Sequence, residues 1–191
     1  MLPKLLIIGA GGFGRSVAEA VVLAQSHDLI GFLDDRWPGL ESVGDVPVLG
    51  RLNDPIGLGQ WRASAALAVV AIGDNLARAA ACQALQAAGF KLATVVHPRA
   101  FVSPSATVAA GCLVMAGAVV GTQAKLGTGA LVNAGAVLDH DVRLGRFAHL
   151  GVGACLGGGA SLADGAWLRA GHALGPGQHL NAETPGLWPV V

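Results

Sequence analysis

An aliphatic residue recurs at every sixth position from Val102 to Leu180, without a slip. A second series, mostly alanine, follows four positions behind the first, from Ala106 to Ala166. An α-helix repeats about every 3.6 residues and a strand every second residue, so neither element explains a period of six. Six residues on each flat side and three sides to a turn give a triangular coil of eighteen residues. Self-similarity of this kind predicts a β-helix solenoid with the shape of a three-sided prism.

The interior of this prism is predicted to hold both series. Each aliphatic residue points inward and stacks on its counterpart one coil away, and the small residues lie near corners that larger side chains would not fit. Adjacent coils pair as parallel strands about 4.8 Å apart, so a little over four coils make a column about 20 Å tall. A low-complexity Ala/Gly segment is the alternative, but composition alone would not keep this register over thirteen steps. Glycine, for which a positive φ carries no Cβ cost, recurs at turn positions that include Gly111, Gly117, Gly129, Gly135 and Gly153.

The first half of the chain has the pattern of an α/β fold. An apolar strand at residues 5–8 leads into a glycine-rich turn at 9–14, and a helix with one apolar face is predicted for 15–25. Strand, glycine turn and helix form a Rossmann-type opening, in which backbone N–H groups at the helix N-terminus can hold a phosphate. A second strand at 29–33 ends in two adjacent aspartates. In a dinucleotide-binding fold, an acid at this place holds a ribose hydroxyl.

Five further elements follow before the repeat begins. They are predicted as a short strand, a short helix, a third strand, a helix and a fourth strand, at residues 44–50, 54–61, 66–72, 76–88 and 92–96. We therefore expect a Rossmann-like domain with a short parallel sheet at 1–97 and a β-helix domain at 98–191. The first domain is about half of a full dinucleotide fold, which favours a single nucleotide, such as a nucleotide sugar, over NAD. Beyond Leu180 the repeat ends, and Trp188 is expected to cover the open end of the prism.

Composition narrows the possible partners. The 191 residues include twelve basic and twelve acidic ones, and this zero net charge argues against a nucleic-acid or anionic-membrane partner. No run of about 18 apolar residues occurs, so no membrane span is expected, and the N-terminus lacks the pattern of a signal peptide. The three cysteines, Cys82, Cys112 and Cys155, have no metal-binding spacing. We expect no metal, buried free thiols and a reducing cytoplasm.

Six motifs along the chain carry a resemblance to a known family. They are Gly9-Ala10-Gly11-Gly12-Phe13-Gly14, Phe32-Leu33-Asp34-Asp35, Ile72-Gly73-Asp74-Asn75 with Arg78, His97-Pro98, the segment 133–141, and His149. With these motifs, essentially the whole chain resembles the NeuD/PglD-type sugar O-/N-acetyltransferases, hexapeptide-repeat acyltransferases with a left-handed parallel β-helix. The left hand is implied by the resemblance only, because general crossover sterics favour the right hand.

The resemblance implies an acetyl-CoA-dependent enzyme that N-acetylates a nucleotide-activated amino sugar in bacterial surface glycan biosynthesis. It also implies a homotrimer with active sites between subunits. The residues implied to bind the nucleotide sugar are Gly11, Gly12, Phe13, Asp34, Asp35 and Gly50.

The resemblance also assigns the residues of the acetyl transfer. His140 is implied as the catalytic base, with Asp141 as the partner that raises its basicity, although the family has the longer Glu at this place. His149 and Gly158 are implied to contact acetyl-CoA. His140 and His149 are nine residues apart, which is half of a coil, so they fall at one level on different sides of the prism. We expect a groove between two neighbouring prisms to bring both to one ligand.

Three alternatives to this function stay open. The first is O-acetylation of sialic acid or another sugar, and the second is a nucleotide-sugar-binding scaffold without catalysis. The third is a zinc enzyme on the same prism, which needs three histidines converging on one metal. The spacing of His140, His149, His172 and His179 does not place three on one coil edge, and we expect the last two to be structural or interfacial.

Overall fold

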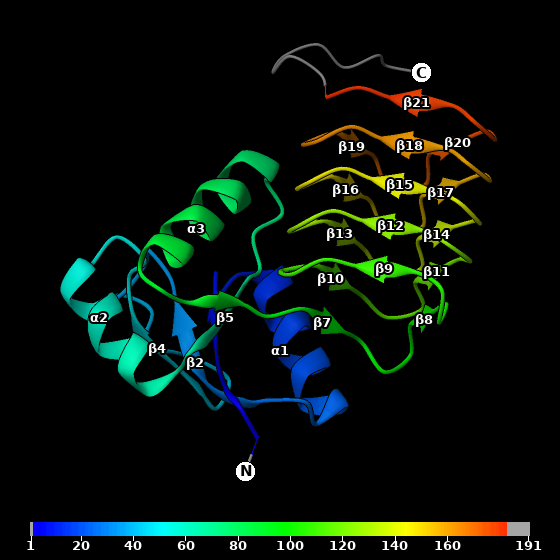
Figure 1. Cartoon of the computed structure of the whole chain (residues 1–191). Coiled ribbons are helices and arrows are strands. Elements are labelled where there is room, and N and C mark those ends of the chain that lie inside the picture. Colours follow the sequence, from blue (N-terminus) through cyan, green and yellow to red (C-terminus); the bar gives the residue numbers. More distant parts are fainter. Residues whose placement is uncertain (1, 183–191) are drawn as a thin grey trace.

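The computed structural model describes residues 2–182, except for the side chains of residues 55–57. The chain folds into an α/β part and a three-sided prism that stand side by side (Figure 1). The expected cap at Trp188 lies outside the described residues.

The α/β part is a six-stranded sheet covered by helices on both faces. Its elements are β1 (Lys4–Ile8), α1 (Gly12–Ala24), β2 (Asp28–Leu33), β3 (Ser42–Val43), β4 (Val46–Gly50), α2 (Pro55–Ser64), β5 (Leu67–Val70), α3 (Asn75–Ala87) and β6 (Lys91–Leu92). The sheet order is β3-β4-β2-β1-β5-β6, and every pair is parallel except the β3–β4 hairpin. Counted along the chain, the parallel strands β1, β2, β4, β5 and β6 follow the order 3-2-1-4-5 of a Rossmann-type sheet.

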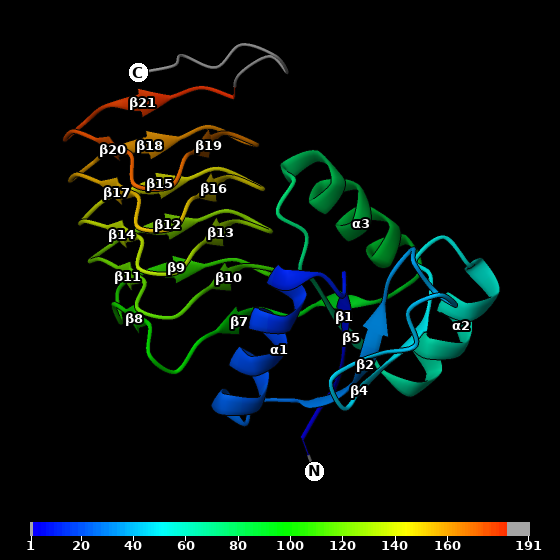
Figure 2. The same ribbon diagram turned by 180° about the vertical axis from the view of Figure 1, so that it is seen from behind.

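The alternation of side chains along β1 decides which helices cover which face. Leu5 and Ile7 pack in one apolar cluster with α1, whereas Leu6 and Ile8 pack in another with α2 and α3. The first cluster continues into Leu113 of the prism. Helix α1 therefore lies between the sheet and the prism, as two opposite views show (Figures 1 and 2).

The prism consists of short strands, each formed by two residues of one flat side. They are β7 (Val95–Val96), β8 (Phe101–Val102), β9 (Thr107–Val108), β10 (Leu113–Val114), β11 (Val119–Val120), β12 (Lys125–Leu126), β13 (Leu131–Val132), β14 (Val137–Leu138), β15 (Arg143–Leu144), β16 (His149–Leu150), β17 (Cys155–Leu156), β18 (Ser161–Leu162), β19 (Trp167–Leu168), β20 (Ala173–Leu174) and β21 (His179–Leu180). They form three five-stranded parallel sheets, in the orders β19-β16-β13-β10-β7, β20-β17-β14-β11-β8 and β21-β18-β15-β12-β9. Partner residues in each sheet are eighteen positions apart, for example Leu138 and Leu156.

The interior of the prism agrees with the predicted pattern. One apolar cluster contains the aliphatic series and the small series together, and most of its members are fully buried. The glycines expected at turns have positive φ angles, from 63° at Gly153 to 76° at Gly111. Two details differ from expectation. Cys155 is exposed rather than buried, because it precedes the inward-facing Leu156 and strand side chains alternate.

The second difference concerns the strand predicted for residues 92–96. The structure divides it into β6, which pairs with β5 of the α/β sheet, and β7, which pairs with β10 of the prism. The two pieces are separated only by Ala93 and Thr94, so the sequence carries no turn signal at the change of partner.

Candidate active site

The carboxyl ends of β1, β2 and β5 border a cleft in the α/β part. Its volume is about 420 Å³, and Gly9, Asp34, Asp35, Asn53 and Ile72 are among the residues that line it. Strand β2 is the neighbour of β1 on one side, and β5 is its neighbour on the other side, so the direction of the strand order reverses at β1. A cleft at such a switch point is where open α/β sheets bind ligands.

The glycine turn after β1 has the close packing that a phosphate-binding turn requires. Gly9 has a φ of 96°, and a Cβ on Gly14 would collide with the carbonyl group of Gly9. Helix α1 begins at Gly12, and its N-cap residue, Gly11, provides no side-chain hydrogen bond. The first N–H groups of the helix are therefore not capped by a side chain and can receive an anion. Phe13 is half-buried at this helix start.

The two aspartates after β2 have different surroundings. Asp34 accepts hydrogen bonds from the N–H of Ala10 at 2.8 Å and from Nε of Arg36 at 2.7 Å. The hydrogen bond from Arg36 is the main cause that lowers the pKa of Asp34 to about 2. Asp35 is exposed and borders both the cleft and a neighbouring hollow. Asp34 thus fixes the glycine turn, and both carboxylates line the cleft, Asp35 without a hydrogen bond to the turn.

Gly50 completes the expected nucleotide-binding set at the same edge of the sheet. It ends β4, and its carbonyl oxygen accepts a hydrogen bond from the N–H of Asp34 at 2.9 Å. The structure therefore brings the six residues expected for the nucleotide sugar to one edge of the sheet, at the ends of β1, β2 and β4.

The prism carries a histidine–aspartate pair at the corner between β14 and β15. Nδ1 of His140 donates a hydrogen bond to Oδ2 of Asp141 at 2.9 Å, and Oδ2 of Asp139 lies 3.9 Å from Nε2. The hydrogen bond to Asp141, and then the charge of Asp139, raise the pKa of His140. The His140 side chain is 61% exposed. With Nδ1 occupied, Nε2 is the nitrogen that can take a proton from a ligand.

Asp141 reaches its partner although it is one methylene shorter than the glutamate of the family. Its φ is 60°, in the left-handed region that corner residues of this prism adopt. This turn brings the side chains of two consecutive residues together, so the shorter side chain suffices.

Gly158 lies directly beside the ring of His140, one coil further along the prism. A Cβ at this position would be 2.6 Å from Nε2 of His140, and the N–H of Gly159 donates to the carbonyl oxygen of His140 at 2.9 Å. The residue expected to contact acetyl-CoA therefore flanks the reactive nitrogen of the expected base. Its missing side chain leaves that nitrogen open.

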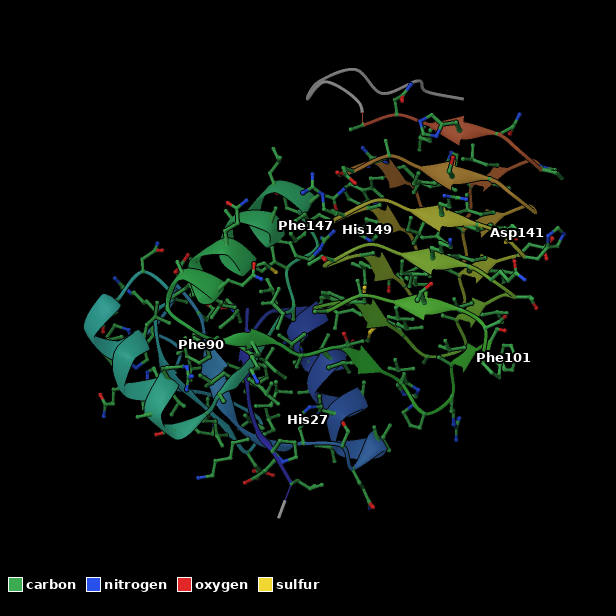
Figure 3. All side chains as sticks on the ribbon, in the orientation of Figure 1. His27, Phe90, Phe101, Asp141, Phe147 and His149 are labelled. Atoms are coloured by element: carbon green, nitrogen blue, oxygen red, sulfur yellow. The ribbon has the colours of Figure 1, made fainter. Side chains whose placement is uncertain are left out.

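His149 lies on another side of the prism, against the α/β part. Its side chain is 5% exposed, and its ring stacks on Trp167 with centroids 4.7 Å apart. Burial, and then the nearby charge of Arg78, lower its pKa to about 4. Within residues 2–182, neither ring nitrogen of His149 has a hydrogen-bond partner. Figure 3 shows His149 next to α3 and Asp141 at the far edge of the prism, so one chain does not bring His140 and His149 together.

The other two histidines lie on the upper coils. Nδ1 of His179 is 2.8 Å from Oγ of Ser161, and Nδ1 of His172 is 3.0 Å from the carbonyl oxygen of Ala170. Among residues 2–182, no group of three or more histidine, cysteine or acidic side chains could hold a metal ion.

Sequence reasoning missed the role of the buried Arg78. This side chain joins α3 to the prism by hydrogen bonds to the carbonyl oxygens of Gly129 and Phe147. The sequence places an arginine in the first turn of a predicted helix, where charged side chains are usually solvated. Its place three residues after the Ile72–Asn75 motif is the one signal in the sequence.

Comparison with known proteins relates the whole chain to sugar acetyltransferases. A profile of the PglD N-terminal domain matches residues 4–85, whereas no curated protein sequence matches the chain. PerB from Caulobacter crescentus, solved with CoA and GDP-perosamine, is 34% identical over 95% of this chain and 84% of its own, with a TM-score of 0.88. Perosamine N-acetyltransferase from the same organism has also been solved as mutants in which a histidine is replaced by asparagine or alanine.

A second relative extends the likeness to acetyl-CoA. The acetyltransferase domain of PglB from Neisseria gonorrhoeae, in complex with acetyl coenzyme A, is 31% identical over 95% of this chain and 97% of its own, with a TM-score of 0.66. The chain belongs to the NeuD/PglD-type family of sugar acetyltransferases. As a member of this family it is an acetyl-CoA-dependent sugar acetyltransferase, and the expected combination of a Rossmann-like sheet with a left-handed β-helix is confirmed.

The helices of this acetyltransferase are short. Within the described part of the chain, none has the length and apolar character needed to cross a membrane.

Replacing Gly158 with Ala should lower acetyl transfer at least tenfold, because the new methyl group would occupy the space beside Nε2 of His140. Steady-state release of CoA thiol measures the effect. Gly59→Ala is the matched control, since nothing lies within 4 Å of a Cβ added at this helical position. Equal activity of the two variants would show that the space beside the ring is not used.

Proposed function

We propose that the enzyme transfers acetyl from acetyl-CoA to the amino group of a nucleotide-linked sugar. The observation that carries this proposal is the exposed His140–Asp141 pair, with Gly158 leaving Nε2 open. The cleft at the carboxyl edge of the sheet supports a nucleotide as the handle of the acceptor. PerB, which is related along most of its length, was solved with GDP-perosamine, an amino sugar carried on a nucleotide. We place the reaction in bacterial surface glycan biosynthesis.

The reaction needs one proton acceptor and no covalent enzyme intermediate. The acceptor amine attacks the thioester carbonyl while Nε2 of His140 takes its proton, so an N–C bond forms. The tetrahedral intermediate then expels CoA as a thiolate, which breaks the C–S bond and receives the proton from the imidazolium. Asp141 holds the Nδ1–H tautomer and stabilises the imidazolium. A backbone N–H of the glycine-rich corner would stabilise the oxyanion.

We propose that acetyl-CoA lies along the corner next to His140, on the side of the following coil. There the next coil provides Gly157, Gly158 and Gly159, so no side chain covers the corner. We propose that Gly158 contacts acetyl-CoA. In this chain His149 is covered by its own α/β part, so its proposed contact with acetyl-CoA requires a movement of the α/β part that uncovers the ring.

A homotrimer would supply the second wall of the site. The outward positions of the sheet β8-β11-β14-β17-β20 form an apolar ladder, and they are Phe101, Val119, Val137, Cys155 and Ala173. Phe101 is 57% exposed in the single chain, and an exposed apolar row of this kind favours a protein interface. His140 lies at the corner that directly follows β14, the middle strand of this sheet. A threefold axis parallel to the prism would place a neighbouring copy, with its nucleotide cleft, beside this corner.

We also propose a cytoplasmic location. All three cysteines are free, and burial raises the pKa of Cys82 and of Cys112 to about 11. Free thiols are typical of reducing compartments.

His140→Ala should lower turnover by about 10² to 10⁴, the usual contribution of a general base. Acetyl transfer to a panel of GDP-, UDP-, dTDP- and CMP-linked amino sugars, followed by mass spectrometry, measures the product. Wild-type transfer to none of them would refute the proposed function, and transfer only to hydroxyl acceptors would favour O-acetylation. His179→Ala, on an upper coil away from the corner, is the control and should keep its rate.

Asp141→Asn should shift the acid limb of the kcat/KM profile to lower pH. A base must be neutral to act, so activity rises with pH through the pKa of His140, and the Asp141 hydrogen bond is the main cause that raises this pKa. The maximal rate should also fall, because an amide stabilises the imidazolium less than a carboxylate does. A profile that keeps its acid limb with the same acceptor would exclude Asp141 as the partner of the base.

Phe101→Glu should convert the trimer to monomers and abolish acetyl transfer, since a charge replaces an apolar side chain in the ladder. Sedimentation velocity and circular dichroism measure assembly and folding together. The exposed Val152, at another corner, gives the control Val152→Glu. A folded, active, monomeric enzyme would show that the site is complete within one chain.

A further inference from the structure

A buried arginine at the start of α3 contacts the wall of the nucleotide cleft. Arg78 is 1% exposed, and its Nη1 donates to the carbonyl oxygens of Ile72 and Gly73 at 3.0 Å each. Ile72 lines the cleft. One side of the guanidinium group therefore holds the segment that joins β5 to α3, at the carboxyl edge where the nucleotide is proposed to bind.

The other side of the same guanidinium group holds the prism. Nε donates to the carbonyl oxygen of Gly129 at 3.0 Å, and Nη2 donates to that of Phe147 at 2.7 Å. Gly129 and Phe147 are eighteen residues apart, so they occupy one corner in two successive coils. Both have left-handed backbones, with φ angles of 67° and 56°.

Asn75 extends this contact by one more coil. Its Nδ2 donates to the carbonyl oxygen of Gly165 at 2.8 Å, and its Oδ1 accepts from Nη2 of Arg78 at 2.8 Å. Gly165 is again eighteen residues beyond Phe147 and has a φ of 70°. Two side chains from one helical turn thus bind three successive carbonyl groups along a single edge of the prism.

These hydrogen bonds do something that the apolar contacts of the joint cannot do. Helix α1 packs on the apolar side chains of Leu113 and Leu131, and apolar contact is not directional, so it would allow sliding along the prism. Hydrogen bonds to carbonyl groups at fixed intervals along the edge hold the α/β part at a single position along the long axis of the prism, which we call its height. Burying an arginine is costly without such partners, and here burial lowers its pKa to about 10.

The height that Arg78 fixes is the height of the catalytic base. The coil between Gly129 and Phe147, the two prism residues that it binds, contains His140 at another corner. In the proposed trimer, the subunits are related by rotation about an axis parallel to the prism, and such a rotation does not shift one subunit along this axis relative to the next. The nucleotide cleft of one subunit would therefore lie level with His140 of the next subunit.

We infer that Arg78, together with Asn75, is a positioning residue that sets the nucleotide cleft level with the base of acetyl transfer. The inference rests on the proposed function, because it assumes that the acceptor is held by its nucleotide. It predicts a defect specific to tethered acceptors.

Arg78→Met keeps an unbranched, largely apolar side chain and removes every donor, so it tests the inference. The kcat/KM for the nucleotide-linked amino sugar should fall at least tenfold, whereas acetylation of the same amino sugar without its nucleotide, at high concentration, should stay within twofold. The Kd of the nucleoside diphosphate alone, measured by calorimetry, should also stay within twofold. Arg78→Lys should recover only part of the loss, since an ammonium group lacks the planar fork that reaches both coils.

Arg62→Met is the matched control. Arg62 lies on α2 and donates to a single carbonyl oxygen, that of Gly89, so its loss should change neither rate. An equal fall for tethered and free acceptors in Arg78→Met would assign Arg78 a structural role and overturn the inference. Unchanged transfer to the tethered acceptor would overturn it as well.

A measurement without acetyl transfer separates this inference from the proposed function. Amide hydrogen exchange of Arg78→Met should speed up in α3 while β14, in the middle of the prism, stays protected. If the wild-type enzyme acetylates no nucleotide-linked amine, the proposed function fails, and unchanged exchange in α3 would then refute the joint independently. Asn75→Ala should give the same pattern with a smaller change, because it removes one of the three coil contacts.

Discussion

The interior of the prism must receive an apolar side chain at the same place in every coil, and this requirement determines the rest of the molecule. Because the chain returns to the same side after eighteen residues, partner residues such as Leu138 and Leu156 stack without a shift. The corners are then aligned as strictly as the interior. Gly158 lies beside His140 for this reason. For the same reason, the three carbonyl groups that Arg78 and Asn75 bind lie above one another along a different corner. The active corner and the domain joint are both consequences of core packing.

The two halves of the enzyme provide different kinds of chemistry. The α/β sheet offers a cleft and a glycine turn that Asp34 holds in place. The prism offers an exposed histidine, His140, whose pKa is raised by neighbouring carboxylates. In the proposed reaction, neither half alone would join a nucleotide to a base. Directional hydrogen bonds from Arg78 join the two halves, and α1 shares an apolar cluster with the prism.

The features of the fold that could be predicted from the sequence are those that its periodicity determines. The sixfold series predicts the prism, its interior and its turn glycines, and the strand–turn–helix pattern predicts the parallel sheet and the glycine turn at its carboxyl edge. The corner position of His140 beside Gly158 also follows from the eighteen-residue coil. Contacts that depend on how the two halves meet could not be predicted. The burial of His149 and Arg78 belongs to this class, since neither residue has a local pattern that signals burial.

The alignment of corners also limits how such a chain can change in length. A residue inserted within a flat side would move later side chains out of register, and an insertion between His140 and Gly158 would separate the two. A loop inserted at a corner, or a duplicated unit of eighteen residues, would leave the stacking intact. Variation in this architecture is therefore confined to corner loops and to whole turns of the solenoid, and the distance between the reactive groups is preserved when the column grows taller.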